Sequence, residues 1–534
     1  MPPSGPHPKF FSLGSILLIA PLCVVGAIIG TQLIVTLGIT TNTSLIGALA
    51  GMALARIPFA AFARYRSVHV QNLAQSAISA ATFGAGNALL LPIGIPFVMG
   101  MPELVLPMLL GVFIAMLVDG YMLYRMFDSE IFPSSGAWPP GVAAAEAIRA
   151  GDEGGRKGLV LLGGLAVGIG GSYFFTGVMS AFGVAFIGNI WALTMFGVGL
   201  LVRGYSALLF GGELFAGLIP KGDIAAAYLP HGMMVGAGLV ALAQVVMLML
   251  RGDGTTPVGT QRSSASVRRS LGIGSVAYLL IALLLALMGG LWAELTPGML
   301  LLFLLYAAFA ALAHELIVGL AAMHAGWFPA FAVALITLVL GILIGFPPLA
   351  LTLLVGFSAA TGPAFADMGY DLKAGYMLRG YGRDPVFERE GRKQQLFAAL
   401  FAFAVAGVVV AIAHPTYFAN NLLPPVDKVY AATIKAGASP DIAWKLFIWA
   451  IPGAIVQFLG GPKRQLGVLF ATGLLISFPA AGWAVLIGVA LRTVWTRLTA
   501  PERRADMEVF AAGVIAGDAL YSFYDLGAKY LRRK

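Results

Sequence analysis

Long apolar runs separated by short polar segments alternate along the whole sequence. Each run has about 20 residues, the length that an α-helix needs to cross the hydrocarbon core of a bilayer. The runs predict membrane spans near 12–37, 44–62, 71–91, 104–124, 158–180, 189–218, 229–250, 271–292, 298–320, 328–346, 349–368, 394–413, 442–459, 465–497 and 507–527. Two of them, 189–218 and 465–497, are long and interrupted, so each forms either one tilted helix or two short ones. The pattern predicts an all-α polytopic membrane protein with 14–16 transmembrane helices, including broken or re-entrant helices.

The most hydrophilic internal segment is RGDGTTPVGTQRSSASVRRS at 251–270, and it divides the chain almost in half. Its Ser, Thr and Gly content is typical of a flexible linker. We therefore expect an N-terminal membrane half at 1–250 and a C-terminal membrane half at 271–534.

Two weak internal similarities suggest that the second half repeats the first. QNLAQSAISA (71–80) and DMGYDLKAGY (367–376) both place polar residues at i and i+4, and they lie 296 positions apart. GGELFAG (211–217) and AGDALYS (516–522) share a glycine followed by an acid at a similar offset. Two halves built alike, with the site between them, are the usual plan of secondary transporters.

The composition agrees with a membrane protein, because 59% of the residues are hydrophobic and 11% are charged, against about 25% charged in soluble domains. The net charge of +9 does not require a nucleic-acid partner, since the basic residues lie in short loops such as RYR (64–66) and GPKRQ (461–465). Lys and Arg are enriched in cytoplasmic loops, so the basic loops predict a cytoplasmic N-terminus. The single cysteine, Cys23, excludes an intramolecular disulfide.

Amide side chains form a polar stripe on an otherwise apolar segment near 71–79. Gln71, Asn72 and Gln75, together with Ser76 and Ser79, follow helical i, i+3 and i+4 spacing. Amides offer both donors and acceptors to a peptide backbone, so we expect Gln71, Asn72 and Gln75 to bind substrate. The alternative is that they form hydrogen bonds between helices.

A second polar group follows the apolar run that ends near residue 362. Asp367 and Asp371 are one helical turn apart and share a face with Tyr370, whereas Lys373 points elsewhere. Two neighbouring carboxyl groups suit a proton carrier, or they could neutralise a cationic substrate group. We expect these four residues to bind substrate and Asp371 also to couple protons. The alternative is a helix end at the cytoplasmic interface, with Lys373 snorkelling.

Further acids and a histidine lie within apolar runs. Glu213 follows two glycines and suits a broken helix with an acid at the break, so we expect it to couple protons; the alternative is an interfacial acid near a loop. His314 and Glu315 lie inside a predicted span, so we expect both to handle protons. A zinc-protease signature would need a second histidine four residues after His314, and Val318 stands there instead.

Two other charged residues, Asp119 and Arg56, lie near the cytoplasmic ends of predicted spans, where snorkelling explains them.

Four segments, in this order, resemble motifs of the oligopeptide transporter family, particularly its yellow stripe-like metal-chelate branch. They are HVQNLAQSAISAATFGAG (69–86), WPPGVAAAEAIRAG (138–151), ADMGYDLKAGYML with the following GRKQQ (366–395), and GVIAGDAL (513–520). The short termini are similar to those of prokaryotic members. The chain departs from the family where Val70, Gln71 and Asn72 stand in place of the common Glu-Asn-Asn.

The resemblance implies a secondary active transporter of the cytoplasmic (inner) membrane, with proton symport of small oligopeptides or peptide-like metal chelates. The chain contains no Walker motif, which argues against ATP hydrolysis. It also has no His/Cys cluster for a bare metal, and the sequence indicates no cofactor and no enzymatic activity. The alternatives are a facilitative channel or uniporter and, from another class, an intramembrane enzyme. Lipid surrounds the chain in each case, and the sequence leaves a homodimer open.

Overall fold

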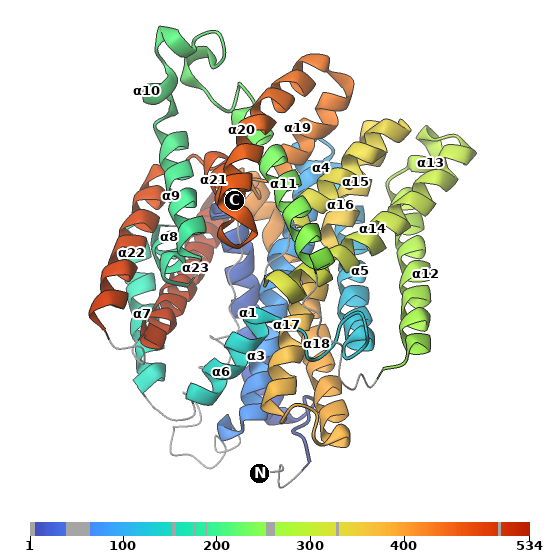
Figure 1. Ribbon diagram of the computed structural model, residues 1–534, viewed down its shortest axis with the longest axis vertical. Coiled ribbons are helices and arrows are strands. Elements are labelled where there is room, and N and C mark those ends of the chain that lie inside the picture. The colour runs from blue at the N-terminus through green and yellow to red at the C-terminus, as the bar shows by residue number, and fades with distance from the viewer. Residues whose placement is uncertain are drawn as a thin grey trace.

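The protein is helical throughout the part of the chain that the computed structural model describes, which comprises residues 6–38, 65–151, 156–175, 178–187, 189–251, 262–326, 330–499 and 504–533 (Figure 1). Within these ranges, ten helices are long and apolar enough to cross a membrane, and five shorter apolar helices accompany them. The prediction of an all-α polytopic membrane protein is therefore confirmed. The predicted span at 44–62, with Arg56, and half of the predicted linker (252–261) lie outside the described residues.

The N-terminal half contributes α1 (Leu13–Thr36), α3 (Val68–Phe83), the π-helix η2 (Gly84–Leu90), α4 (Leu91–Val98), η3 (Pro102–Leu104), α5 (Val105–Met126), α6 (Pro139–Gly151), α7 (Arg156–Phe174), α8 (Val178–Ile187), α9 (Ile190–Gly204), α10 (Ser206–Phe210), η4 (Glu213–Phe215), η5 (Pro220–Gly222) and α11 (Leu229–Arg251). The C-terminal half contributes α12 (Ser264–Met288), α13 (Leu291–Glu294), α14 (Pro297–Ala325), α15 (Ala330–Ile344), α16 (Pro348–Ala360), α17 (Pro363–Leu378), α18 (Pro385–Ala419), α19 (Asp427–Ala438), α20 (Pro440–Arg464), α21 (Leu466–Leu474), α22 (Pro479–Leu498) and α23 (Arg504–Arg533).

Helices from the two halves of the sequence pack against each other throughout the bundle. α3 contacts α17 and α18, α11 contacts α20, α9 contacts α21, and α7 contacts α23. In Figure 1, α7–α9 lie with α22 and α23 at one side of the molecule, and α5, α12 and α14 lie at the other. α1, α3, α17 and α18 lie between these groups. The functional residues are therefore brought together from distant parts of the sequence.

Two long segments are enclosed by protein, and they carry the polar stripes. In an apolar 18-residue stretch of each segment, 89% of the residues are buried for Val68–Val98 and 94% for Pro348–Leu378, against 17% for Pro440–Arg464. Polar side chains on the first two segments consequently face other helices and not lipid. Burial inside protein is the condition under which polar groups persist at membrane depth.

Glycines permit a close helix crossing between α7 and α23. Gly164 and Gly168 on α7 face Gly513 and Gly517 on α23, and a Cβ at any of the four would collide with the partner backbone. Such pairs of glycines four residues apart let membrane helices approach closely. GVIAGDAL thus serves helix packing here.

Three predicted spans are divided in the structure. The segment 349–368 contains the end of α16 and the start of α17, and 465–497 forms α21 and α22. The segment 189–218 forms α9 and the short α10, then continues as a 3₁₀ turn at Glu213–Phe215. Both interrupted runs are therefore divided, although α22 is itself long enough to span a membrane and α10 has only five residues.

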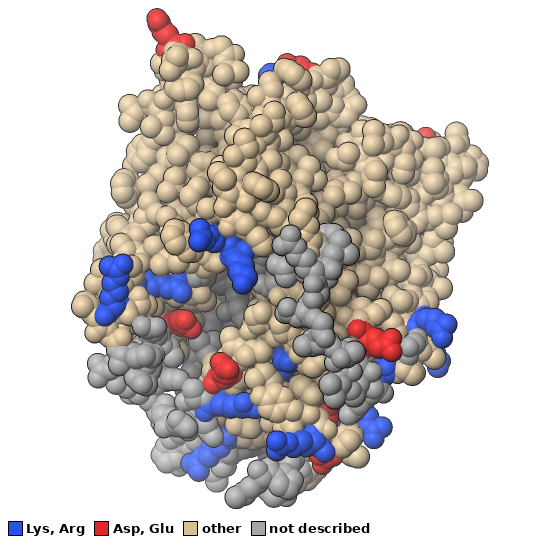
Figure 2. Space-filling view, viewed as in Figure 1, with Lys and Arg blue, Asp and Glu red and all other residues tan. Residues whose placement is uncertain are grey.

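Basic side chains gather at one end of the molecule. On the face shown in Figure 2, most Lys and Arg lie over the lower part, which is the end where Figure 1 places the N-terminus. The upper part of this face is largely free of them.

Candidate functional site

A cavity of about 370 Å³ opens between helices of both halves. Its walls come from α1, η2, α11, α15, α16, α17, α19 and α21, and most of its lining is apolar. The polar side chains in the lining are Asn87, Tyr370, Tyr430, Gln465 and Thr472. Apolar walls with a few placed hydrogen-bonding groups are the usual construction of a small-molecule site.

Two irregularities in the enclosed segments border this cavity. Asn87 lies in the middle of the π-helix Gly84–Leu90, which interrupts the long segment 68–98. Ala359 and Pro363 lie on either side of the break between α16 and α17, and both line the cavity. π-Helical turns and discontinuous membrane helices both occur frequently at functional sites.

Titratable side chains bond to the backbone groups that the break between α16 and α17 releases. Nδ1 of His314 lies 2.5 Å from the carbonyl oxygen of Thr361. The next backbone amide, Gly362 N–H, donates to Oδ2 of Asp119 at 2.9 Å. The C-terminal end of a helix carries partial negative charge and the N-terminal end partial positive charge. An imidazole at the end of α16 and a carboxylate at the start of α17 complement both ends.

His314 also links the break to the cavity wall. Its Nε2 lies 2.8 Å from the carbonyl oxygen of Ala330, a cavity-lining residue. Both ring nitrogens therefore face carbonyl oxygens. A neutral imidazole has a single N–H, so the two contacts are both hydrogen bonds only when the ring carries two protons.

Asp119 and Glu315 form a fully buried acid pair beside the break. Asp119 also accepts a 2.7 Å hydrogen bond from the hydroxyl of Tyr278, on α12. Glu315 lies close enough to Asp119 to interact with it electrostatically, and its carboxyl group also interacts with the hydroxyl of Tyr278. All three side chains are fully buried. The prediction that Asp119 snorkels to the interface is therefore wrong, because α5 is packed inside protein at this position.

The polar stripe of α3 bonds directly to the acids of α17. The Gln75 amide donates to Oδ1 of Asp371 at 2.5 Å, and the Ser79 hydroxyl donates to Oδ1 of Asp367 at 2.6 Å. Asn72 supports Gln75 by donating to its side-chain oxygen at 2.9 Å. A step of four residues forward on α3 matches four backward on α17, so the two helices cross antiparallel. The remaining oxygen of each aspartate has no partner in the described part of the chain.

The other predicted substrate-binding residues lie in different surroundings. Lys373 donates to the carbonyl oxygens of Ser134 and Gly136 at 2.8 and 2.9 Å, so it is buried and does not snorkel. Gln71 donates to the carbonyl oxygen of Tyr65 at 2.9 Å.

Tyr370 alone among the seven predicted substrate-binding residues lines the cavity, and its hydroxyl has no partner among the described residues. The indole of Trp138 packs against its ring, edge to face.

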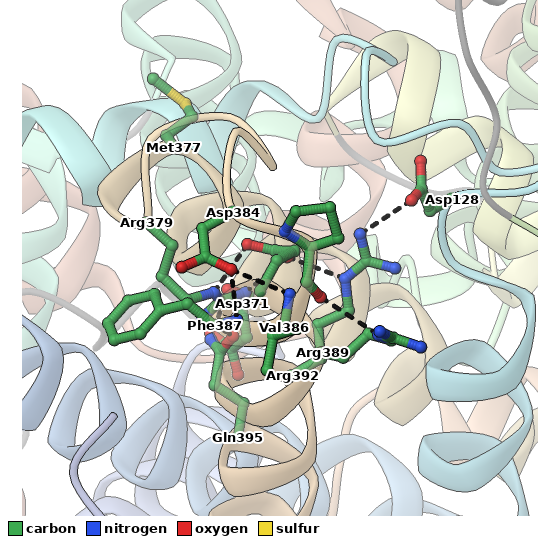
Figure 3. A network of polar contacts seen from close by, with 12 residues as sticks. Asp128, Asp371, Met377, Arg379, Asp384, Val386, Phe387, Arg389, Arg392 and Gln395 are labelled. Atoms are coloured by element: carbon green, nitrogen blue, oxygen red, sulfur yellow. Dashed lines mark hydrogen bonds and ion pairs between the residues drawn. The ribbon is translucent and has the colours of Figure 1, made fainter. Parts of the chain in front are cut away.

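An ion network joins α17 to the start of α18 (Figure 3). Arg379 forms two hydrogen bonds to Glu388, at 2.8 and 3.0 Å, and Arg392 bonds to Glu388 and to Asp128, both at 2.8 Å. Gln395 accepts from Arg379 at 2.7 Å and donates to the backbone oxygen of Asp371, also at 2.7 Å. The network fixes the position of α17, and the only sequence signal for it was the i, i+4 pair Glu388 and Arg392.

Glu213 lies apart from both acid clusters. It is exposed, in a 3₁₀ turn after α10, and α10 projects from the end of the molecule opposite the N-terminus (Figure 1). The expected broken membrane helix around Glu213 is not present, because the regular helix ends at Phe210. The placement matches the alternative of an acid near the interface.

The described residues contain no group of three or more His, Cys, Asp or Glu side chains that could hold a metal ion. The family model described as OPT oligopeptide transporter protein matches the chain over residues 13–250 and 225–526. No curated protein matches it.

Proposed function

The chain belongs to the oligopeptide transporter family, and we propose that it is a secondary active transporter that moves small oligopeptides together with protons. The observation that carries the proposal is the arrangement at the break between α16 and α17. There Asp119 and His314 bond to the freed backbone groups, with Glu315 buried beside Asp119, next to a cavity built from both halves of the chain.

The Asp119–Glu315 pair is the proposed proton carrier. An ionised carboxylate at membrane depth without a cation is costly. Glu315 is fully buried, and the groups that interact with it, Asp119 and Tyr278, are not cations. A protonated acid avoids this cost. Release of the proton is favoured once the cavity side of the break is opened to water. Gly362, at the start of α17, bonds to Asp119, and Thr361, at the end of α16, bonds to His314. A change in the protonation of Asp119 therefore alters the forces that hold the break.

Asp371, with Asp367, is the second candidate carrier. Both are fully buried, and each has one oxygen without a partner among the described residues. They lie behind Tyr370 and do not line the cavity, so we assign them mainly to holding α3 against α17.

The substrate is proposed to lie in the cavity against Tyr370 and the other polar lining residues. The volume of about 370 Å³ is in the lower part of the range of small-molecule sites, roughly 300–1,000 Å³, which favours short peptides. The polar lining is uncharged and can exchange hydrogen bonds with peptide groups. A peptide-like metal chelate fits the same lining, because the chelator brings its own metal ligands.

We propose that the protein lies in the cytoplasmic (inner) membrane, with its N-terminus in the cytoplasm. Lys and Arg gather at the end of the molecule where the N-terminus lies (Figure 2), and cytoplasmic loops are the ones enriched in these residues.

The test is acidification inside proteoliposomes loaded with a pH-sensitive dye, with di-, tri- and tetrapeptides compared with an iron–nicotianamine chelate. We expect acidification with the short peptides. Acidification with the chelate alone would mean that the substrate is a metal chelate and not a peptide, while proton coupling would be supported. Passage of labelled peptide without acidification would overturn the coupling and leave a facilitative uniporter.

A further inference from the structure

A second cavity, distinct from the proposed substrate site, lies where α5, α12 and α18 meet. Its volume is about 390 Å³, and its lining consists of Tyr124, Arg262, Ser263, Ser266, Arg389 and Arg392. Three of these six residues are arginines, and none is acidic. The site thus gathers cations and hydroxyl groups around an open space.

The arginines keep donors available to a ligand. Arg392 uses Nε and Nη2 to bond to Glu388 and Asp128 (Figure 3), while its Nη1 makes no hydrogen bond to the described residues. Among the same residues, Arg389 uses only Nε, which donates to the carbonyl oxygen of Pro385 at 3.1 Å. Arg262 donates from Nη2 to the carbonyl oxygen of Tyr124 at a weak 3.4 Å. Guanidinium groups with free N–H pairs match the geometry of phosphate oxygens.

Positive charge exceeds negative charge around this cavity. The two nearby carboxylates, Asp128 and Glu388, are both bonded to Arg392, and Glu388 is shared with Arg379. Burial lowers the pKa of the Arg262 guanidinium, and Arg392 and Arg125 lower it further because like charges crowd the site. An anion in the cavity would relieve this repulsion.

The position of the cavity at the edge of the bundle indicates where the anion comes from. α12 lies at the periphery, and its first residues are at the same end of the molecule as the N-terminus (Figure 1). An exposed apolar face continues from there along the helix and includes Ile273, Val276, Leu280, Leu283 and Leu287. A headgroup beside the arginines would place acyl chains along this face.

We propose that Arg262, Arg389 and Arg392, with the hydroxyl groups of Ser263 and Ser266, bind the headgroup phosphate of an anionic phospholipid. Basic pockets between membrane helices on the cytoplasmic side are suited to such headgroups. The bound lipid would join α12 to the start of α18, next to the ion network that holds α17.

The test compares the full-length protein in detergent with two double variants by native mass spectrometry, after addition of cardiolipin or of the zwitterionic phosphatidylcholine. Arg262→Gln/Arg389→Gln removes two pocket cations and leaves the ion pairs of Arg392 intact. Arg268→Gln/Arg269→Gln is the matched control, because both residues are exposed on α12 and do not line the cavity.

We expect the pocket variant to retain less cardiolipin by roughly fivefold for each arginine removed, whereas the control variant and phosphatidylcholine binding change little. An equal loss of cardiolipin binding in the pocket variant and the control variant would overturn the assignment of the lipid to this cavity. Displacement of cardiolipin by millimolar inorganic phosphate, with phosphate alone protecting the wild type but not the pocket variant against thermal unfolding, would overturn the lipid as the ligand.

Discussion

The two buried acid pairs of this bundle differ in what holds them. Asp367 and Asp371 accept hydrogen bonds from side chains of a neighbouring continuous helix, Ser79 and Gln75. Asp119 accepts from a tyrosine and from the backbone amide of Gly362, at the point where a membrane segment is interrupted. Side-chain bonds between two complete helices fix their crossing. Bonds to the free ends of half-helices couple protonation to a place where the backbone can rearrange.

The largest expected effect comes from substitutions in the break cluster, which we define as Asp119, His314 and Glu315 beside the break between α16 and α17. Asp119→Asn retains a group of the same shape but cannot exchange a proton, so we expect accumulation of peptide against its gradient to fall to the level of empty liposomes. Exchange of labelled for unlabelled peptide at equal pH should persist, because it requires no net proton movement. Loss of both activities together would instead assign Asp119 to the substrate pathway or to folding.

The backbone at the break should be the next most sensitive position. Gly362 has φ +100°, and a Cβ there would lie 2.9 Å from Cβ of Val318 and 3.1 Å from Nδ1 of His314. We expect Gly362→Ala to destabilise the protein by about 1–3 kcal/mol, measured as thermal unfolding in detergent. Gly272→Ala is the control, since Gly272 has open space around it in α12. Similar effects of both substitutions would contradict a specific role of the break.

Substitutions that remove hydrogen bonds between α3 and the aspartates of α17 should lower the stability of the protein more than its transport activity. Ser79→Ala removes the hydroxyl that donates to Asp367, and hydrogen bonds between membrane helices contribute about 0.6–2 kcal/mol. We expect a lower unfolding temperature with proton-coupled uptake retained in the folded fraction. Uptake that loses its pH dependence without any loss of stability would place this pair in the coupling pathway.

The smallest expected effect on transport concerns Asp427, a buried acid outside the membrane-spanning helices, for which the expected change is in the pH dependence of stability. Neither oxygen has a partner among the described residues, and burial raises the pKa of Asp427 well above its usual value, opposed in part by Lys428. The folded state therefore binds the proton more tightly than the unfolded state, whose pKa is about 3.9.

Stability should consequently decline as the pH rises from about 4 towards the folded-state pKa of Asp427, by up to about 1.4 kcal/mol per pH unit. Asp427→Asn should remove this part of the pH dependence, measured by thermal unfolding between pH 4 and pH 8. An unchanged pH profile in the variant would show that Asp427 is ionised in the folded protein.

The apolar pattern was sufficient to predict the class of fold, because span length and composition follow directly from the thickness of the bilayer. It also predicted the stripe at Gln71–Ser79 and the acids at Asp367 and Asp371. The bonds between them depend on an antiparallel crossing of helices almost 300 residues apart, which no local pattern contains.

The sequence predicted only part of the break cluster. His314 and Glu315 stood out inside an apolar run, and Thr361, Gly362 and Pro363 form a helix-breaking triplet. Asp119 was misjudged because its distance from the end of a predicted span resembles that of a snorkelling residue, and Tyr278 gave no signal. Glu213 was placed in a broken helix because composition alone does not distinguish an apolar helix from the apolar turns after α10.

The decisive measurement is peptide-driven acidification of dye-loaded proteoliposomes that contain Glu315→Gln, Asp371→Asn or the exposed control Glu103→Gln, each at equal protein content. We predict no acidification with Glu315→Gln, reduced but clear acidification with Asp371→Asn, and wild-type behaviour with Glu103→Gln. Acidification that survives in Glu315→Gln and disappears in Asp371→Asn would contradict the assignment and make the α3–α17 pair the proton carrier.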